Sequence, residues 1–283
     1  MKGENVMTWF RESENFWKGQ QMSLEVEEML FEGKSKFQDI KIFQSTTYGR
    51  VLVLDGVIQC TEKDECSYQE MLAHLAMRAH PDPKKVLIIG GGDGGIIREV
   101  LKYNVTDVHI CEIDAMVIDK CKEFIPSMAH SFDNDKVSVH IRDGFEFLNE
   151  NADEFDVIVT DSSDPVGPAE SLYQPKYFDL VYRALKDDGV FTMQGECMWL
   201  HTELIKNCMN DLRSSLFKQV EYAWTSVPTY PCGTIGFLVA AKSDDHTVMI
   251  PRKAIEEMDL KFYTPELHCA SFIKPKFVQE ALQ

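Results

Sequence analysis

The sequence predicts an α/β protein in which a small antiparallel β domain precedes an open, mostly parallel sheet with helices on both faces. From Lys85 onward, short β-rich runs alternate with periodic helical segments, which is the pattern of a parallel sheet. A glycine-rich loop follows the first of these runs. Before Lys85, short apolar runs are joined by Asp55-Gly56, a strong hairpin signal. We therefore expect one domain over residues 1–62 and a second over residues 63–283.

The elements of the first domain can be placed in order. Ile40-Lys41-Ile42 alternates apolar and charged side chains, and Val51 to Leu54 is separated from Val57 to Gln59 only by the Asp55-Gly56 turn. A helix is predicted over Ser67 to His80, because apolar residues recur there on one helical face and the run ends against a proline.

The second domain is expected to contain seven strands. Four strand and helix units come first, and a fifth strand is followed by a helix over Leu204 to Leu216. A short connection joins the last two strands, so these should be antiparallel. The predicted strands are Val86 to Ile89, Val108 to Ile113, Val137 to Ile141, Val157 to Thr160, Gly189 to Met193, Val220 to Ser226 and Thr234 to Ala241.

Composition limits the partners and the compartment. The formal net charge of -17 disfavours nucleic acid or an anionic membrane as a partner, because both are polyanions. The sequence has neither an apolar run of membrane-spanning length nor a secretory leader, so we expect a cytoplasmic protein. The eight cysteines form no C-x-x-C pair, and the eight histidines show no ligand spacing. Reduced thiols and no metal are expected.

Acidic residues follow the strands of the parallel sheet, at the edge where ligands bind in such folds. Asp93 lies in the loop Gly90 to Gly95 after the first strand, and Glu112, Asp143 and Asp161 follow the next three. Solvation of strand ends or capping of helices explains one such residue by itself. Their joint placement favours a site for a cation.

The loop matches G-x-G-x-x-G, which by itself suits a dinucleotide such as NAD. Asp93 argues against that ligand, because a carboxylate in this loop repels a pyrophosphate. A sulfonium nucleoside fits better, with Glu112 on the ribose and with Asp143 and the Gly144 backbone on the adenine edge. Asp93 would also repel the carboxylate of S-adenosylmethionine and would pair with the terminal ammonium of its decarboxylated form.

Short motifs are spread over nearly the whole chain. They are Trp9 to Glu12, Phe37 to Ile40, Tyr48 to Gly56, Ser67 to Glu70, Gly90 to Gly95, Cys111 to Asp114, Asp143 to Phe147, Asp161 to Ser171, Gln194 to Glu196 and Pro228 to Pro231. Together these motifs resemble those of the spermidine synthases of the aminopropyltransferase family. The resemblance implies transfer of the aminopropyl group of decarboxylated S-adenosylmethionine to putrescine, giving spermidine and methylthioadenosine. It also implies a methyltransferase-like Rossmann domain, a homodimer and no permanently bound cofactor.

The resemblance also assigns roles to residues. Carried over by motif, the donor-binding residues are Gln38, Gln69, Asp93, Glu112, Asp143 and Gly144. The putrescine-binding residues are Tyr68, Asp161, Asp164, Tyr230, Trp9 and Glu196, with Asp161 also the catalytic proton acceptor.

The chemistry of putrescine explains the need for two aspartates after the fourth strand. Putrescine is a dication at neutral pH, because an alkyl ammonium has a pKa of about 10.4. One carboxylate can take the proton of the attacking nitrogen while the other holds the diamine. A carboxylate of ordinary pKa is a poor acceptor, so either burial raises the pKa of Asp161 or the proton passes on to water. Ser162 to Lys176 is either a loop that closes over the ligands or a static connection.

Four other functions remain open at this point. A putrescine N-methyltransferase would use intact S-adenosylmethionine, which Asp93 disfavours. A synthase of spermine or thermospermine would differ only in the acceptor. A non-catalytic polyamine-binding or nucleoside-binding subunit would be expected to have lost Asp93 or Asp161, and both are present. An NAD-dependent oxidoreductase is the alternative that rests on the fold alone.

Overall fold

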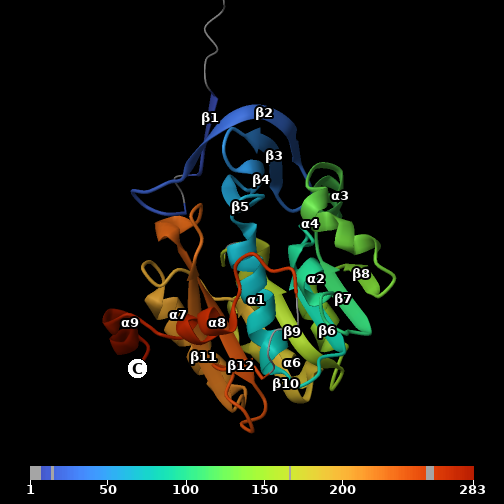
Figure 1. Ribbon diagram of the computed structural model, residues 1–283, viewed down its shortest axis with the longest axis vertical. Helices are drawn as coiled ribbons and strands as arrows, with labels where there is room; N and C mark the ends of the chain where they lie inside the picture. Colours follow the sequence, from blue (N-terminus) through green and yellow to red (C-terminus); the bar gives the residue numbers. More distant parts are fainter. Residues whose placement is uncertain (1–7, 14–15, 166, 253–257) are drawn as a thin grey trace, which may run out of the picture.

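The computed structural model describes residues 8–13, 16–165, 167–252 and 258–283 and contains two sheets (Figure 1). A five-stranded sheet lies at one end of a larger, seven-stranded sheet, so the predicted fold class is confirmed. The smaller sheet contains β1 (Thr8–Arg11), β2 (Ser23–Lys34), β3 (Asp39–Ser45), β4 (Gly49–Leu54) and β5 (Val57–Thr61). The larger contains β6 (Lys85–Gly90), β7 (Asp107–Glu112), β8 (Val137–Ile141), β9 (Phe155–Asp161), β10 (Leu185–Gln194), β11 (Gln219–Ser226) and β12 (Thr234–Ala241).

The smaller sheet is an antiparallel meander in the order β1-β2-β3-β4-β5. Its β4–β5 turn has φ angles of 49° at Asp55 and 82° at Gly56. Two positive φ values are the geometry of the tight hairpin turn that Asp-Gly predicts. This hairpin faces the larger sheet and supplies one wall of the cavity described below.

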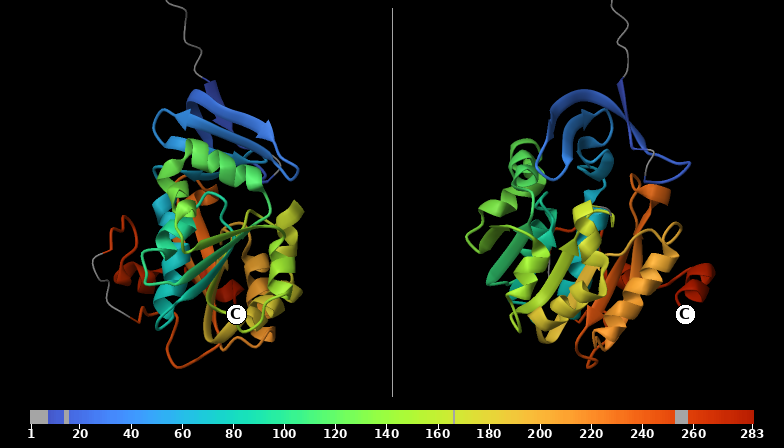
Figure 2. Two further views of the ribbon diagram at one scale, coloured as in Figure 1. Left: turned by 90° about the vertical axis from the view of Figure 1, so that its right-hand side faces the viewer. Right: turned by 180° about the vertical axis from the view of Figure 1, so that it is seen from behind.

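The larger sheet has the order β11-β12-β10-β9-β6-β7-β8, in which only the pairs made by β12 are antiparallel. Strand order reverses between β6 and β9, where α/β sheets bind ligands. Alternate strand residues enter two separate cores, because helices cover both faces (Figure 2). The helices are α1 (Glu65–Ala79), α2 (Gly95–Val100), α3 (Ala115–Phe124), α4 (Pro126–Ala129), α5 (Gly144–Asn149), α6 (Pro175–Ala184), α7 (Thr202–Ser214), α8 (Pro265–Ser271) and α9 (Lys276–Ala281), with 3-10 turns η1 (His130–Asp133), η2 (Gly167–Tyr173) and η3 (Pro231–Gly233).

Helix α1 differs from its sequence pattern. One apolar face was expected, but all of its residues except Cys66 are buried. The reason is that α1 lies against the larger sheet on one side and is covered by the chain before α8 on another. There the Glu70 carboxylate accepts hydrogen bonds from the backbone amides of residues 261–263 at 2.7–2.9 Å. The polar residues of α1 are therefore held by tertiary partners rather than by water.

The described helices include none that combines the length and the apolar character needed to cross a bilayer.

Candidate active site

A cavity of about 200 Å³ lies between the β4–β5 hairpin and the carboxyl ends of β6, β7, β9 and β10. Its lining contains neither lysine nor arginine among the described residues, and His201 is its only basic side chain. Buried carboxylates are costly without a positive partner, so this composition favours a cationic ligand and disfavours phosphate. The acidic side chains that line it are Asp55, Asp93, Glu112, Asp143, Asp161, Asp164 and Glu196.

Glycine brings the first strand exit close to the fourth. Gly90 has a φ of 78°, and a Cβ built on it would lie 2.0 Å from the carbonyl oxygen of Asp161. The Gly91 amide donates to that same oxygen at 3.2 Å. Any side chain at position 90 would therefore push the glycine loop away from Asp161 and from the cavity.

Asp93 occupies the position at which a dinucleotide-binding loop holds its pyrophosphate. Its Oδ1 accepts the Gly95 amide at 2.7 Å, at the start of α2, and its Oδ2 accepts the Gln69 side-chain amide at 3.1 Å. The amide that would bind a phosphate is thus already used, which argues against NAD. Burial nevertheless raises the pKa of Asp93, against the effect of these hydrogen bonds.

The residues predicted to bind the nucleoside lie together at the next two strand exits. Glu112 is 8% exposed, and burial raises its pKa to about 7, although its Oε1 accepts the Asp114 amide at 2.8 Å. Asp143 also caps a helix, since its Oδ1 accepts hydrogen bonds from the Phe145 and Glu146 amides at the start of α5. Gly144 has no room for a side chain, because a Cβ there would lie 2.5 Å from Ile89.

Gln38 reaches this end of the cavity from the smaller sheet. Its amide donates to Asp114 Oδ2 at 2.9 Å, and Ser35 donates to the same oxygen at 2.6 Å. Asp114 also caps α3 through its Oδ1. Asp114 was not among the predicted site residues, yet it connects the smaller sheet to Glu112. Only its place in the motif Cys111 to Asp114 indicated that it belongs to the site.

The residues predicted to bind the diamine are also brought together, apart from one. Tyr68 on α1 donates its hydroxyl to Asp161 Oδ1 at 2.7 Å. The rings of Tyr68 and Tyr230 have their centroids 5.6 Å apart, and Tyr230 donates to the carbonyl oxygen of Gln59 at 2.5 Å. These contacts fix an aromatic wall between the smaller sheet and Asp161.

The assignment of Trp9 needs correction. Trp9 lies opposite Glu25 in the β1–β2 pair, is 50% exposed and does not line the cavity. Trp17, only 5% exposed, lines it instead. The physical reason is that β1 is the far edge strand of the smaller sheet, whereas the chain after β1 returns toward the cavity.

Burial raises the pKa of both aspartates at the exit of β9. Desolvation, followed by the nearby Asp93 charge, raises the pKa of Asp161 to about 8. Desolvation and then Glu196 raise the pKa of Asp164 to about 7. Both values lie closer to that of an alkyl ammonium than an ordinary carboxyl does, so proton transfer is easier.

Glu196 has a partner that sequence analysis missed. It is 2% exposed, has a φ of 63° and lies 2.7 Å from His201 Nδ1. This contact raises the pKa of His201. The two residues are five positions apart across a turn, a spacing that signals neither a helix pair nor a metal site. Folding alone places His201 against Glu196.

The segment 162–176 contains more structure than a loop. Apart from Val166, which lies outside the described residues, it includes η2 and leads into α6. Tyr173 anchors it, since its hydroxyl donates to Gln194 Oε1 at 2.8 Å. Closure over ligands stays a prediction.

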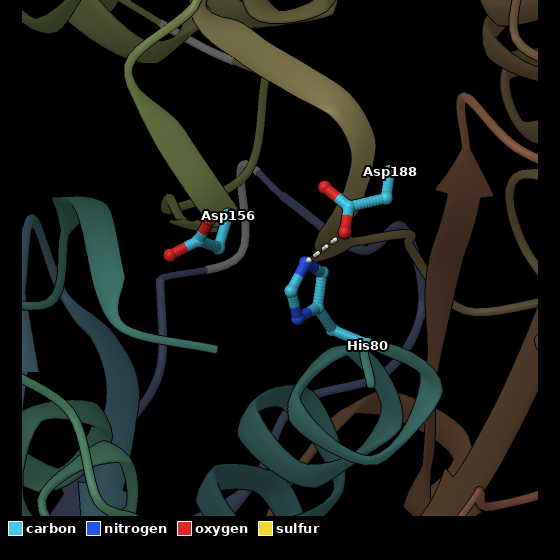
Figure 3. A group of neighbouring side chains, drawn as sticks. All are labelled: His80, Asp156 and Asp188. Carbon is cyan, nitrogen blue, oxygen red and sulfur yellow. Dashed lines mark ion pairs between the residues drawn. The ribbon is translucent and has the colours of Figure 1, made fainter. Parts of the chain in front are cut away.

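A group of potential metal ligands lies elsewhere, at the amino ends of the strands (Figure 3). His80, Asp156 and Asp188 place ligand atoms within 4.8 Å of one another. Asp156 already accepts the amides of Lys84 and Lys85 and the Lys186 ammonium. His80 Nδ1 accepts a hydrogen bond from the Asp82 amide, so the ring proton lies on Nε2. His80 Nε2 lies 3.5 Å from Asp188 Oδ2. Burial lowers the pKa of His80, so a neutral imidazole faces the Asp188 carboxylate, and protein partners already occupy Asp156.

The chain is similar to known proteins over nearly its whole length. A family model described as "Spermine/spermidine synthase domain" matches residues 65–250, and one described as "Spermidine synthase tetramerisation domain" matches residues 8–62. The spermidine synthase of Schizosaccharomyces pombe is 51% identical over 97% of this chain and 93% of its own length. Spermidine synthase 2 of Datura stramonium is 46% identical over 97% and 90%.

Two solved structures are also similar over most of both chains. A spermidine synthase in complex with the transition state analogue AdoDATO has a TM-score of 0.90, with 36% identity over 97% of this chain and 94% of the other. The spermidine synthase of Thermotoga maritima has a TM-score of 0.89, with 34% identity over the same shares.

The raised pKa of Asp161 leads to a stability prediction. Its native carboxyl keeps its proton up to about pH 8, whereas the unfolded carboxyl loses it near pH 3.8. The native state therefore binds more protons across this window, and this group's contribution to the free energy of unfolding falls as pH rises. Asp161→Asn removes the titrating group, and its side-chain oxygen can still accept the hydrogen bond from Tyr68. We expect this variant to have a higher Tm, by about 2–4 °C for each kcal/mol added to the free energy of unfolding. The increase should grow from pH 4 to pH 8.

Thermal unfolding of both proteins at pH 4, 6 and 8 measures this effect. Asp119→Asn on α3 is the matched control, because the Asp119 side chain is exposed and its replacement should give no pH-dependent gain. A variant Asp161→Asn that is equally or less stable than the parent at pH 8 would show that the charged form of Asp161 is not costly.

Proposed function

The chain belongs to the spermidine synthase family and is an aminopropyltransferase, and we propose that the carboxylates of its cavity hold two cationic substrates for direct transfer. The reaction moves an aminopropyl group to putrescine and yields spermidine. The observation that supports the proposed site best is a cavity lined by seven acidic residues and by neither lysine nor arginine among the described residues. The same composition disfavours NAD.

The donor is decarboxylated S-adenosylmethionine in this proposal. Glu112 takes the ribose hydroxyls, Asp143 and the Gly144 backbone read the adenine, and Gln38 and Gln69 complete the pocket. Asp93 pairs with the terminal ammonium of the aminopropyl group, which the intact nucleoside's carboxylate would prevent. The structurally similar spermidine synthase bound to AdoDATO supports a donor site of this kind. We propose that transfer requires no metal and no resident cofactor.

The acceptor end is proposed to hold putrescine between Asp161 and Asp164. The distal ammonium pairs with Asp164 and Glu196 beside Tyr230, while the near nitrogen lies at Asp161 and Tyr68. The two bound cations lower the pKa of Asp161, so its carboxyl is ionised when the substrates are in place. The Asp161 carboxylate then takes one proton from that nitrogen, and the freed electron pair forms a bond to the aminopropyl carbon. The carbon–sulfur bond breaks as this bond forms, so sulfur leaves with its electron pair as neutral methylthioadenosine. Positioning two cations side by side is itself a large part of the catalysis.

The role of Asp161 can be tested by identifying products. Purified protein is offered putrescine with either decarboxylated or intact S-adenosylmethionine, and spermidine and methylthioadenosine are expected from the decarboxylated donor alone. Asp161→Asn should keep donor binding and lose about 100-fold or more in kcat, because the amine loses its acceptor. Mass spectrometry of the products and initial rates measure both effects.

N-methylputrescine from the intact donor would instead identify a methyltransferase. An absence of product with either donor would identify a binding subunit. Unchanged kcat in Asp161→Asn would remove Asp161 from the mechanism.

The role of Asp93 is tested by comparing two ligands. Asp93→Ile and Asp93→Asn should each weaken binding of the decarboxylated donor by about tenfold or more, since both remove the charge that pairs with its ammonium. Methylthioadenosine has no ammonium, so its Kd should change far less. Asn keeps the shape of Asp93 and serves as the matched variant if Ile disturbs the loop. Titration calorimetry giving equal losses for both ligands with Asn would contradict the assignment.

We also propose that the chain divides near residue 62 and self-associates through the first part, with a homodimer as the smallest unit. The family model over residues 8–62 is described as a tetramerisation domain, which corresponds to two such dimers. Trp9 on β1 and Met29 on β2 are large apolar side chains left exposed in this sheet. A cytoplasmic location is proposed because all eight cysteines are free thiols, as expected in a reducing compartment.

Light scattering during gel filtration tests the assembly. The expected mass is two or four times the 32.4 kDa of the chain. Replacing both exposed apolar side chains by Ser should lower it. A mass of one chain for the unmodified protein would contradict self-association.

A further inference from the structure

Two thiols lie beside the acceptor end of the cavity, on neighbouring loops. Cys197 follows Glu196 after β10, is 2% exposed and lines the cavity. Cys232 lies in η3 between β11 and β12 and is exposed. The cavity wall on the η3 side is made by Tyr230 and Pro231, the two residues that precede Cys232.

The sheet holds these loops in register. Gln194 pairs with Phe237 in the β10–β12 ladder, and two backbone hydrogen bonds continue the pairing from Gly195 and Glu196 to Gly236 at 2.8 and 2.9 Å. Further along, the Cys197 sulfur lies 3.4 Å from Thr234 Oγ1. Cys232 is only two residues before that threonine, and a left-handed φ of 57° turns the chain there. Non-glycine residues with such angles are uncommon and are typical of functional sites.

Thr234 links the two thiols, because it contacts the Cys197 sulfur and follows Cys232 by two residues. Burial raises the pKa of the Cys197 thiol, Thr234 lowers it, and the nearby Cys232 raises it. Cys232 has its own outer contact, with the Gln20 side chain at 3.5 Å. Cys197 is therefore a protonated, shielded thiol within reach of an exposed one. This is the arrangement of a resolving and a reacting cysteine.

We propose that Cys197 and Cys232 are a reversible redox pair whose disulfide draws η3 onto the Glu196 loop and restricts the acceptor end of the cavity. The oxidant is a hydroperoxide. The Cys232 thiolate attacks its terminal oxygen and becomes a sulfenic acid, while the peroxide leaves as an alcohol, or as water from hydrogen peroxide. Cys197 sulfur then attacks Cys232 sulfur, the sulfur–oxygen bond breaks and water leaves. Two thiols lose two protons and two electrons in all, and a dithiol reductant reverses the change.

The consequence for catalysis follows from the loops that are joined. Glu196 directly precedes Cys197, and Tyr230 lies two residues before Cys232. The two residues lie on opposite sides of the proposed diamine position. A covalent bond between the loops draws η3 toward the Glu196 loop and narrows the space between them, because a disulfide holds its two Cβ atoms about 4 Å apart. The donor residues lie at the exits of β6, β7 and β8, away from this link. Oxidation should therefore act on putrescine rather than on the donor.

Peptide mapping and kinetics test this proposal with one treatment. Reduced protein is exposed to hydrogen peroxide, excess oxidant is removed, and non-reducing digestion is followed by mass spectrometry. We expect a linked peptide that joins Cys197 to Cys232, a several-fold rise in the KM for putrescine, an unchanged donor Kd and recovery with dithiothreitol. The effect on KM rests on the proposed function, whereas the linked peptide does not, so their failures are distinguishable.

The chain offers a matched pair of variants. Cys232 and Cys269 are its two exposed cysteines, and neither lines the cavity. Cys232→Ser should keep the reduced activity and resist peroxide, whereas Cys269→Ser should remain as sensitive as the parent. Absence of the Cys197–Cys232 peptide, a link through another cysteine, equal inactivation of Cys232→Ser, or a complete link with unchanged KM would each overturn the proposal.

Discussion

The burial of several carboxylates in one cavity, with no lysine or arginine among its described lining residues, is the constraint on which the site depends. Burial raises the pKa of Asp93, Glu112, Asp161 and Asp164, and the nearby Asp93 raises that of Asp161 further. Ionisation of these carboxyls is therefore unfavourable unless a cation lies beside them. In the proposed function, a diamine and a sulfonium nucleoside with a terminal ammonium supply such charges at the two ends of the cavity.

The rest of the structure holds this cluster together against its own repulsion. Glycine at position 90 lets two strand exits touch, and the fully buried α1 delivers Tyr68 and Gln69 to the cavity. Hydrogen bonds between parts of the chain far apart in sequence fix the remaining walls, such as those from Gln38 to Asp114 and from Tyr230 to Gln59. Because these groups are already satisfied by protein partners, they lose little freedom when a ligand binds.

The same burial that disfavours ionisation of Asp161 suits the proposed chemistry. A buried carboxyl with a pKa of about 8 is costly to ionise, but in the proposed reaction it is a better proton acceptor for an amine than an exposed aspartate. The Glu196 contact with His201 is a smaller case, in which an imidazole from a nearby turn compensates one acid of the acceptor end. Loss of stability and gain of function arise from one physical cause, the exclusion of water from the carboxylates.

The sequence by itself determined the features that depend on local pattern. Alternating strands and helices, the Asp55-Gly56 turn and an acid after each parallel strand predicted the fold and the acidic edge, because parallel strands end at the same edge. Only the tertiary structure decided which side chains reach the cavity. For example, the sequence around Trp9 and Trp17 does not show that Trp17 lines the cavity and Trp9 does not. The tertiary structure alone placed His201 against Glu196 and Cys232 beside Cys197, because these pairings depend on loop geometry. It also raised the pKa of Asp161, since desolvation is a property of the surroundings and not of the residue.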